Sequence, residues 1–281
     1  MNAPEALQLG LHKNMPAERY HSIAAMSAGG LKRMRMSPAH FYGLQLDPRR
    51  PPAGSTDALA LGSLFHTALF EPGELAARYV VKPAGLDGRT KEGKAWAAEH
   101  ADREIVDAAK HGAALDMAAA VRALPDIAAL MADGFAESSA FWLDDQTGEL
   151  CKCRPDWTSP AGDGVVLVDG KSTQDASPEG FGRAIWNFSY HLQAAWYSDG
   201  FERATGQRVH GFVFAAVESS WPHAAAAYML GDDVLEAARR ENRRLLDLYA
   251  ECRRTGVWPG YANAVSLISL PRWARFGAQD E

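Results

Sequence analysis

The chain has 281 residues, and its 29 Lys and Arg residues against 35 Asp and Glu residues give a formal net charge of −6 at pH 7. Hydrophobic residues make up 47%, which is enough for a folded core, and the chain holds neither a long apolar run nor a signal-peptide pattern at Met1–Gly10. These features predict a globular protein of the cytoplasm with no membrane span, and the whole-chain charge gives no sign of nucleic-acid binding.

The three cysteines, Cys151, Cys153 and Cys252, are too few for a disulfide framework and predict a reducing compartment. Cys151 and Cys153 lie two apart in a strand-like run, so they share one face and are expected to be small packing residues. An iron–sulfur cluster would need about four thiolates, which this chain does not have.

The first part of the chain predicts short helices. The opening to about Glu18 has no clear period and is expected to be loosely ordered. Ser27 is placed as the N-cap of a helix that ends near Met36, and Ser37-Pro38 begins another. The segment Asp47–Gly54, rich in Pro and Arg, predicts a loop.

A buried helix is predicted over Thr56–Phe70, because apolar residues occur nearly all round it. On spacing alone, His66 within this helix is a core histidine. A polar loop is expected over Arg78–Lys94, followed by an Ala-rich helical region over Ala95–Leu124 that breaks near Gly112.

Strand-like runs follow at Ser138–Leu143, Leu150–Asp156 and Val165–Asp169, with a hairpin loop between the first two and Pro160–Gly164 between the second and third. Further predicted elements are a two-piece helix from Ser177-Pro178 to Arg203 and strands at Val209–Val217 and His223–Leu230. A charged helix is predicted from Asp232 to about Thr255, with its arginines on a solvated face. The tail over Trp258–Trp273 is expected to pack back on the body.

This order predicts an α/β fold with a mixed central sheet flanked by helices and N-terminal helical additions. We expect a single domain over residues 1–281. Its predicted parts are a helical N-terminal part (1–136), a catalytic sheet core (137–230), and a C-terminal helix and tail (231–281).

Acidic and basic side chains gather at the ends of the predicted strands. Asp169 and Lys171 point to the same face, with Gly170 between them, and Asp156 ends the preceding strand-like run. Two carboxylates on neighbouring strands can hold a hard cation such as Mg²⁺, and a nearby lysine can orient water or stabilise developing charge. By itself, however, Asp169-Gly170-Lys171 is more typical of a surface salt bridge.

A predicted helix after these strands places Tyr190, Gln193 and Tyr197 on one face, at i, i+3 and i+7. The spacing favours an aromatic core stripe, although a buried glutamine amide would need hydrogen-bond partners. Glu137 opens the first strand and is interpreted as a charged strand end, with membership of the acidic site as the alternative.

Five segments together carry a resemblance to a known family. They are Gly62-Ser63-Leu64-Phe65-His66, Cys153-Arg154-Pro155-Asp156, Asp169-Gly170-Lys171-Ser172-Thr173, the helical segment from Tyr190 to Gly200, and Leu270-Pro271-Arg272-Trp273-Ala274. The pattern resembles the PD-(D/E)xK nuclease superfamily, and more closely the RecE-type exonuclease VIII family of phage and prophage recombination exonucleases. The resemblance extends from about Tyr20 to the C-terminus.

The resemblance implies a PD-(D/E)xK core and assigns roles to site residues. Asp156, Asp169, the backbone carbonyl of Gly170 and His66 would bind Mg²⁺, for which Mn²⁺ can substitute. Lys171 would position the attacking water. The resemblance makes Gln193 and Tyr197 accessory catalytic residues, and it allows the loop Arg89–Lys94 to be either a solvated loop or a basic loop near DNA.

The implied activity is that of a Mg²⁺-dependent DNA exonuclease that degrades linear double-stranded DNA from the 5′ end without ATP and leaves a 3′ single strand. A single-strand annealing protein would take up that strand, and the resemblance implies a toroidal homo-oligomer. The alternatives are an endonuclease or repair accessory nuclease of the same fold, and a catalytically inactive DNA-binding protein.

Overall fold

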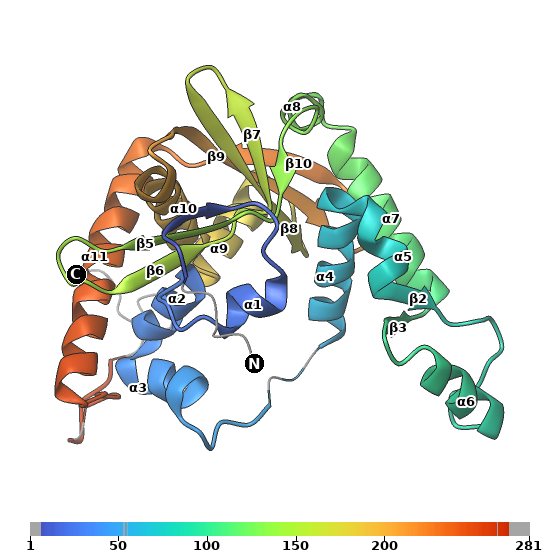
Figure 1. The fold of residues 1–281 in the computed structure, drawn as a ribbon, viewed down its shortest axis with the longest axis horizontal. Coiled ribbons are helices and arrows are strands. Elements are labelled where there is room, and N and C mark those ends of the chain that lie inside the picture. Colours follow the sequence, from blue (N-terminus) through green and yellow to red (C-terminus); the bar gives the residue numbers. More distant parts are fainter. Residues whose placement is uncertain (1–6, 53, 55, 263, 270–281) are drawn as a thin grey trace, which may run out of the picture.

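The computed structural model describes residues 7–52, 54, 56–262 and 264–269 and forms a mixed α/β fold (Figure 1). The helices are α1 (Ala17–Ser22), α2 (Ala28–Met36), α3 (Pro38–Phe41), α4 (Asp57–Phe70), α5 (Leu75–Arg78), α6 (Lys91–Glu99), α7 (Ala108–Arg122), α8 (Pro125–Leu130), α9 (Pro178–Asn187), α10 (Tyr190–Thr205) and α11 (Asp232–Thr255), with a π-helical turn at Tyr42–Leu46 and a 3-10 turn at Pro72–Glu74. The strands are β1 (Gly10–His12), β2 (Tyr79–Val81), β3 (Glu104–Val106), β4 (Phe135–Ala136), β5 (Ser139–Leu143), β6 (Leu150–Cys153), β7 (Trp157–Ala161), β8 (Gly164–Thr173), β9 (Arg208–Glu218) and β10 (Ala225–Met229).

The central sheet has five strands in the order β10-β9-β8-β7-β4. Strands β8 and β9 are parallel and pair over their whole length, whereas the other neighbours are antiparallel. A second sheet, β1-β5-β6, is antiparallel throughout, and a small parallel pair, β2 and β3, lies apart from both. The predicted mixed sheet flanked by helices is therefore confirmed.

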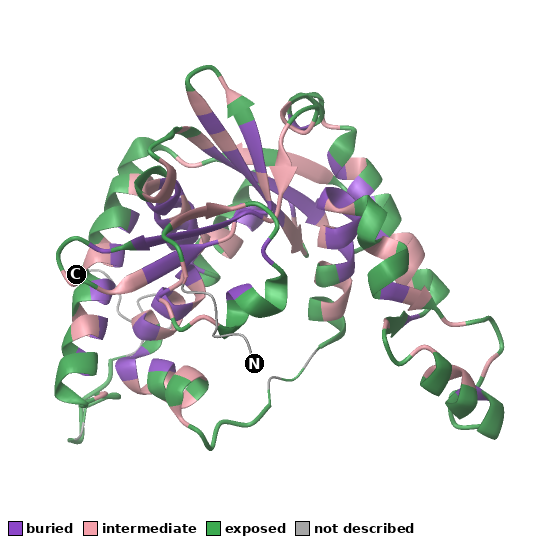
Figure 2. Cartoon of the chain, viewed as in Figure 1, coloured by how far each residue is buried: buried purple, intermediate pink, exposed green. Residues whose placement is uncertain are grey.

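Helices cover both faces of the central sheet, so β9 is buried on both sides. Phe212, Phe214 and Ala216 pack with residues of α9 and α10, whereas Val213 and Ala215 pack with residues of α4 and α7. The side chains alternate between the faces because successive strand residues point in opposite directions. This explains why the strand reads as an unbroken apolar run. Figure 2 shows the buried residues on the central strands and on the inward sides of these helices.

Capping residues fix the starts of four helices at the predicted places. Ser27, Ser37, Thr56 and Ser177 each accept a hydrogen bond from a backbone N–H in the first turn of α2, α3, α4 and α9 respectively. Each hydroxyl satisfies one of the N–H groups that a helix leaves unpaired at its start. Gly206 and Gly256 follow α10 and α11 with left-handed backbone angles, which end those helices.

Several sequence-based predictions are wrong in detail. The opening is not loosely ordered throughout: β1 pairs with β5, a long-range contact that leaves no local signal. The segment Arg78–Lys94 contains β2 and the start of α6, and the following helical region breaks at β3 rather than near Gly112, which lies inside α7. Helix α7 begins after Asp107 because the carboxylate of this residue caps the first turn.

Two further corrections concern burial and strand ends. Helix α4 is not buried all round, because Leu59 in its first turn is 60% exposed. The run Leu150–Asp156 is not one strand: β6 ends at Cys153, and the chain then crosses into the central sheet as β7. Pro155 lies at this crossing, where its missing N–H costs no ladder hydrogen bond.

Other predictions on packing are confirmed. Cys151 and Cys153 are both buried in the core between α2, α10 and α11. The α11 arginines are exposed or half-buried, and four of them pair with acidic side chains of the same chain, as Arg239 does with Asp199. The tail is an exception: it packs back at its start, where the ring of Trp258 stacks on Phe41, but Val265, Leu267 and Ile268 are exposed, so the prediction is confirmed only in part. Residues 270–274 lie outside the described part. In the described part, no helix is long and apolar enough to cross a membrane.

Candidate active site

Two buried aspartates face each other where β7 begins and β8 is near its middle. Trp157 pairs with Val168 in the antiparallel register, so the next pair along the two strands is Asp156 and Asp169. The backbone N–H of Gly170 donates a 2.9 Å hydrogen bond to Oδ2 of Asp156. The crossing between the two sheets thus brings two carboxylates to one point, as predicted.

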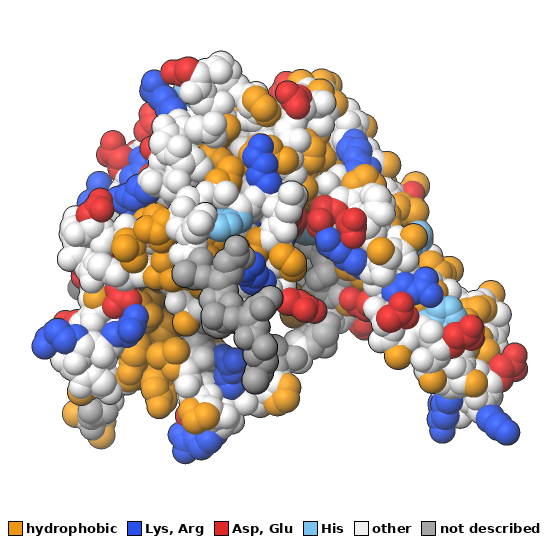
Figure 3. Space-filling model, viewed as in Figure 1, with side chains coloured by type: hydrophobic (Ala, Val, Ile, Leu, Met, Phe, Trp, Pro, Cys, Tyr) orange, Lys and Arg blue, Asp and Glu red, His pale blue; other side chains and the backbone are white. Residues whose placement is uncertain are grey.

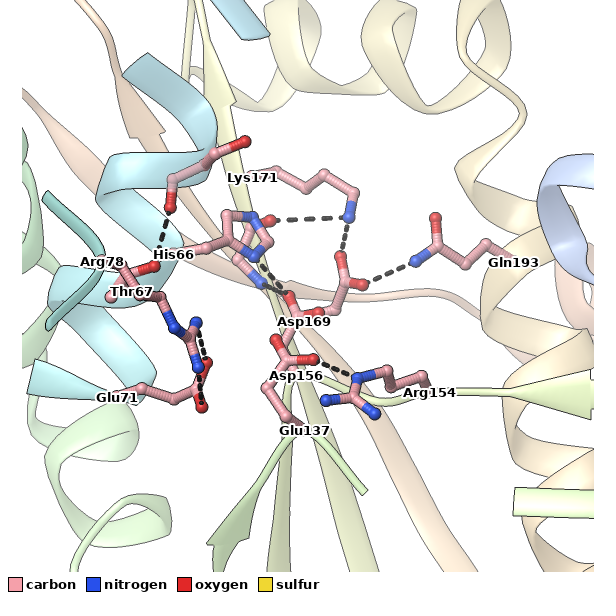
Figure 4. A network of polar contacts seen from close by, with 12 residues as sticks. His66, Thr67, Glu71, Arg78, Glu137, Arg154, Asp156, Asp169, Lys171 and Gln193 are labelled. Atoms are coloured by element: carbon pink, nitrogen blue, oxygen red, sulfur yellow. Dashed lines mark hydrogen bonds and ion pairs between the residues drawn. The ribbon is translucent and has the colours of Figure 1, made fainter. Parts of the chain in front are cut away.

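Polar partners fix the carboxylate of Asp169 on both sides (Figure 4). Lys171 Nζ donates to its Oδ2, and Gln193 Nε2 donates to its Oδ1 at 2.6 Å. Lys32 of α2 donates to Oε1 of Gln193 at 3.1 Å. Both Nε2 and Oε1 of the buried Gln193 amide therefore have hydrogen-bond partners, as a buried amide within an aromatic stripe requires.

Helix α4 brings His66 to the same site, with Nδ1 3.3 Å from Oδ2 of Asp156. This approach requires glycine at position 170, because a Cβ there would lie 2.9 Å from Cε2 of Phe70 and 3.3 Å from Cε1 of Phe65. The absent side chain lets α4 pack directly on β8. The glycine between Asp169 and Lys171 therefore sets the position of the imidazole.

Glu137 completes a group of possible metal ligands. Ligand atoms of His66, Glu137 and Asp156 all lie within 4.8 Å of one another. Glu137 holds a left-handed backbone angle, φ 52°, which is uncommon for a non-glycine residue and costly. Its Oε2 accepts a 2.6 Å hydrogen bond from Arg154 Nε. The interpretation of Glu137 as a charged strand end alone is thus incomplete, because its carboxylate belongs to the cluster.

The charges of the cluster depend on burial and on one another. Burial and the neighbouring Asp169 raise the pKa of Asp156 well above its usual range. Burial opposes the charge of Lys171, but Asp169 and Asp156 outweigh it and raise the pKa of this lysine. Burial, together with Lys171, lowers the pKa of His66 to about 4. At neutral pH the lysine is therefore an ammonium, and the imidazole is neutral with a lone pair free to bind a cation.

The donor set fits a divalent cation. Burial and repulsion from Asp169 raise the pKa of Asp156, so its charged form is costly, and a cation bound to its carboxylate would relieve that cost. Carboxylate oxygens from Asp156 and Glu137 and the neutral His66 nitrogen are suitable ligands for Mg²⁺ or Mn²⁺. Both oxygens of Asp169 already accept hydrogen bonds, so its role as a metal ligand, like that of the Gly170 carbonyl, stays a prediction.

The cluster opens into a cavity of about 450 Å³ that is lined by residues of both signs of charge. Its wall includes Lys171, Tyr190 and an ion pair in which Arg78 donates two hydrogen bonds to Glu71. A larger groove of about 1100 Å³ adjoins it, and Ala58 and Ser172 line both. The site is therefore accessible to an extended ligand that passes over β8.

Two predicted site features lie elsewhere. Tyr197 packs its ring edge on Phe212, with centroids 6.0 Å apart, and lines a separate cavity of about 860 Å³. The segment Arg89–Lys94, predicted as a loop, contains the start of α6 and lies on an arm that projects from the body, where Figure 3 shows Lys and Arg atoms at the far end. Neither feature has a hydrogen bond to the carboxylates, although Asp169 and Asp156 lie near enough to Tyr197 to add to the effect of burial in raising its pKa. The proposed roles of both features stay predictions.

Some residues of the site were not predicted from sequence. Lys32, half-buried beside Gln193, comes from a short helix whose sequence shows only its cap. Tyr190 was identified as part of the stripe, but its place beside Lys171 was not, and Lys171 Nζ lies 4.9 Å from its ring centroid. Arg154 could have been predicted as a residue of the site, because it lies only two positions before Asp156 in the Arg-Pro-Asp segment.

Comparison with solved structures supports the fold. A crystal structure described as a "putative exonuclease" from Eubacterium rectale matches with a TM-score of 0.63 and 16% identity over 92% of this chain and 96% of that one. The protein SSO0001 matches with a TM-score of 0.30 and 11% identity, over 69% of this chain and 88% of that one, and the protein VC1899 from Vibrio cholerae with a TM-score of 0.24 and 9% identity, over 88% and 58%. These two similarities carry no argument.

A comparison with curated proteins found no significant match. The family model of a PDDEXK-like domain of unknown function, DUF3799, matches residues 27–271. This match includes both aspartates, Lys171, His66 and Gln193, and the mixed sheet is the one that a PD-(D/E)xK core requires. The chain therefore belongs to the PDDEXK-like DUF3799 family.

Proposed function

We propose that the protein is a divalent-metal-dependent nuclease that hydrolyses phosphodiester bonds of DNA. The observation that carries the proposal is the convergence of Asp156, Asp169, Lys171 and His66 at one cavity in a chain of the PDDEXK-like family. If Asp169 and Lys171 formed only a structural salt bridge, the imidazole of His66 and the third carboxylate, that of Glu137, would not be needed beside it.

Each residue has a task that its geometry supports. Asp156, Glu137 and His66 would hold the metal ion, which when bound supplies an acidic water and polarises the phosphate. Lys171 stays protonated beside Asp169, so it serves as a hydrogen-bond donor that orients water and stabilises negative charge, and not as a base. Gln193 keeps the Asp169 carboxylate in a single orientation.

We further propose the finer activity: exonucleolytic degradation of linear double-stranded DNA, from the 5′ end, without ATP, with a 3′ single strand as product for an annealing protein. Its support is the resemblance to the RecE-type family and the description of the Eubacterium rectale neighbour as an exonuclease. Mg²⁺ as the natural metal and a toroidal homo-oligomer belong to the same proposal.

An endonuclease of the same fold is the second candidate, because its catalytic residues would be the same. End-labelled linear DNA separates the two. The proposed 5′ exonuclease releases a 5′ label as small products at once, releases a 3′ label late, and leaves covalently closed circular DNA intact. Cutting of the closed circle, or release of the 3′ label first, would contradict the 5′ exonuclease proposal.

A further inference from the structure

Two large aromatic side chains are exposed beside the active site. Trp186 at the end of α9 is 63% exposed, and Phe188 in the turn before α10 is 60% exposed. Exposed aromatic residues near a site often mark a binding surface, because burying them on a ligand removes apolar area from water. Trp186 lies just before the short turn that joins α9 to α10, and Phe188 lies in that turn.

The turn between α9 and α10 is strained and clamped. Ser189 has left-handed backbone angles, φ 55° and ψ 40°, although it is not a glycine. Its hydroxyl accepts a 2.7 Å hydrogen bond from Nη1 of Arg35, whose guanidinium also lies 4.6 Å from the ring centroid of Trp186. Strain of this kind persists only where the surroundings enforce it. The turn therefore holds Phe188 outward in a fixed position.

The ring of Tyr190 contacts both Phe188 and Lys171. It stacks on Tyr190 with centroids 5.6 Å apart and planes 29° apart, and Lys171 Nζ lies 4.9 Å from the centroid of Tyr190. Phe188 lines the groove of about 1100 Å³, whereas Tyr190 lines the catalytic cavity. Phe188 therefore stands where the groove passes into the site.

Charge at this point favours phosphates on one side only. Lys32 Nζ lies 5.0 Å from the ring centroid of Tyr190, and the guanidinium of Arg35 lies 4.6 Å from that of Trp186, so one cation of α2 lies beside each of these two rings. Glu241, whose charge lies near Arg35, is paired with Arg244 at 2.8 Å. On the other side, the groove holds matched pairs of opposite charge, Lys110 with Asp57 and Arg183 with Asp175.

We propose that Phe188, together with Trp186, is a stacking platform for an unpaired nucleobase of the strand whose phosphate lies at the carboxylates. The inference rests on the proposed function, because it takes nucleic acid as the substrate. The ring of Phe188 lines a groove without net positive charge, which suits a base, while the cations of α2 suit the phosphate backbone. The substrate class is thus a strand whose end is single-stranded, so a duplex end has to open before it is cut.

The test measures binding apart from hydrolysis. Labelled 12-nucleotide strands, one of thymidines and one of abasic spacers with the same phosphates, are titrated in an Asp156→Asn background. Stacking on aromatic side chains is worth about 1–3 kcal/mol per base, so Phe188→Ala should raise the dissociation constant of the thymidine strand about 5- to 150-fold. The same change should leave the abasic strand within about twofold, because its phosphates still meet Lys32 and Arg35.

Two variants serve as controls. Phe188→Tyr keeps the ring and should keep the preference for the strand with bases. Tyr261→Ala removes another exposed aromatic residue, 75% exposed and packed on His40 of α3, and should change neither affinity. Equal weakening of both strands by Phe188→Ala, no change in either, or failure of the protein to bind the thymidine strand would each overturn the platform.

A parallel assay keeps the two proposals apart. If the protein with its native Asp156 cuts linear duplex DNA but base-dependent binding is absent, the platform fails and the nuclease stands. If base-dependent binding is present and no DNA is cut with Mg²⁺ or Mn²⁺, the platform stands and the nuclease fails.

Discussion

Gln193 donates a 2.6 Å hydrogen bond from its Nε2 to Oδ1 of Asp169, although the two residues lie in different elements, α10 and β8. The carboxylate has Lys171 on its other oxygen, so both of its oxygens are committed. A buried carboxylate held in this way cannot rotate, and its fixed orientation sets the position of the lysine. The hydrogen bond therefore links the helix after the catalytic strand to the chemistry of the site.

We predict that Gln193→Leu, which keeps the approximate volume, lowers kcat about 10-fold or more and changes KM little. The reason is that Asp169 loses a hydrogen bond that orients it, whereas the surface that meets DNA stays unchanged. Steady-state rates on linear duplex DNA give both constants. A rise in KM at constant kcat would show instead that Gln193 binds the substrate.

Glu137 offers a test of the metal site. Glu137→Gln removes one charged ligand from the group with His66 and Asp156, so Mn²⁺ affinity measured by calorimetry should fall about 10-fold or more. The matched control is Glu71→Gln, which removes a carboxylate of the same cavity that is already bound by Arg78. Equal losses in the two variants would mean that only the general negative charge of the cavity matters.

Gly170→Ala should destabilise the fold by about 1–3 kcal/mol, because the new Cβ would press on Phe70 and Phe65 of α4. Urea unfolding measures the loss. Adding Phe70→Leu should recover part of it, which a double-mutant cycle reports as a coupling between the two sites. The control Gly182→Ala, in exposed helix with nothing within 4 Å of the added Cβ, should stabilise the protein by about 0.5–1 kcal/mol. If Gly170→Ala were as stable as the parent, α4 would not pack on β8 as described.

Lys152 predicts a pH dependence of stability away from the site. Its side chain is buried, donates to the carbonyls of Tyr20 and Ile23 at 2.7 Å, and burial lowers its pKa from 10.5 to about 8. Between these two pH values the unfolded chain binds more protons than the folded one, so the free energy of unfolding rises with pH. Relative to Lys152→Met, the parent should gain on the order of 3 kcal/mol between pH 7.5 and 10.5.

That difference is measured by urea unfolding of both proteins at each pH, so that other titrations cancel. No change in the difference across the range would show that Lys152 keeps its ordinary pKa and is better solvated than its burial indicates.

Local signals in the sequence were enough to predict much of this fold. Ser27, Ser37 and Ser177 each mark a helix start that depends only on the next few residues. The apolar run of β9 predicted a strand buried on both faces, because no polar alternation interrupts it.

The site was predicted where neighbours in sequence are also neighbours in space. Asp169 and Lys171 share a face of β8, and Asp156 lies just before β7, which pairs with β8 as the adjacent antiparallel strand. Glu137 and Lys32 could not be assigned, because their contacts depend on a left-handed turn and on how α2 docks. Tyr197 was placed on the helix face of Gln193 by its spacing, but its side chain packs on Phe212 and lines another cavity.

The most direct test of the account is digestion of linear duplex DNA with Mg²⁺ or Mn²⁺ by the parent protein, Asp169→Ala and Lys171→Ala, with folding of each checked by circular dichroism. The account predicts cutting by the parent only when the metal is present, and a loss of at least about 100-fold in both folded variants, because each removes a group that orients or stabilises the reacting charge. A parent that cuts nothing, or variants that cut as fast as the parent, would contradict it.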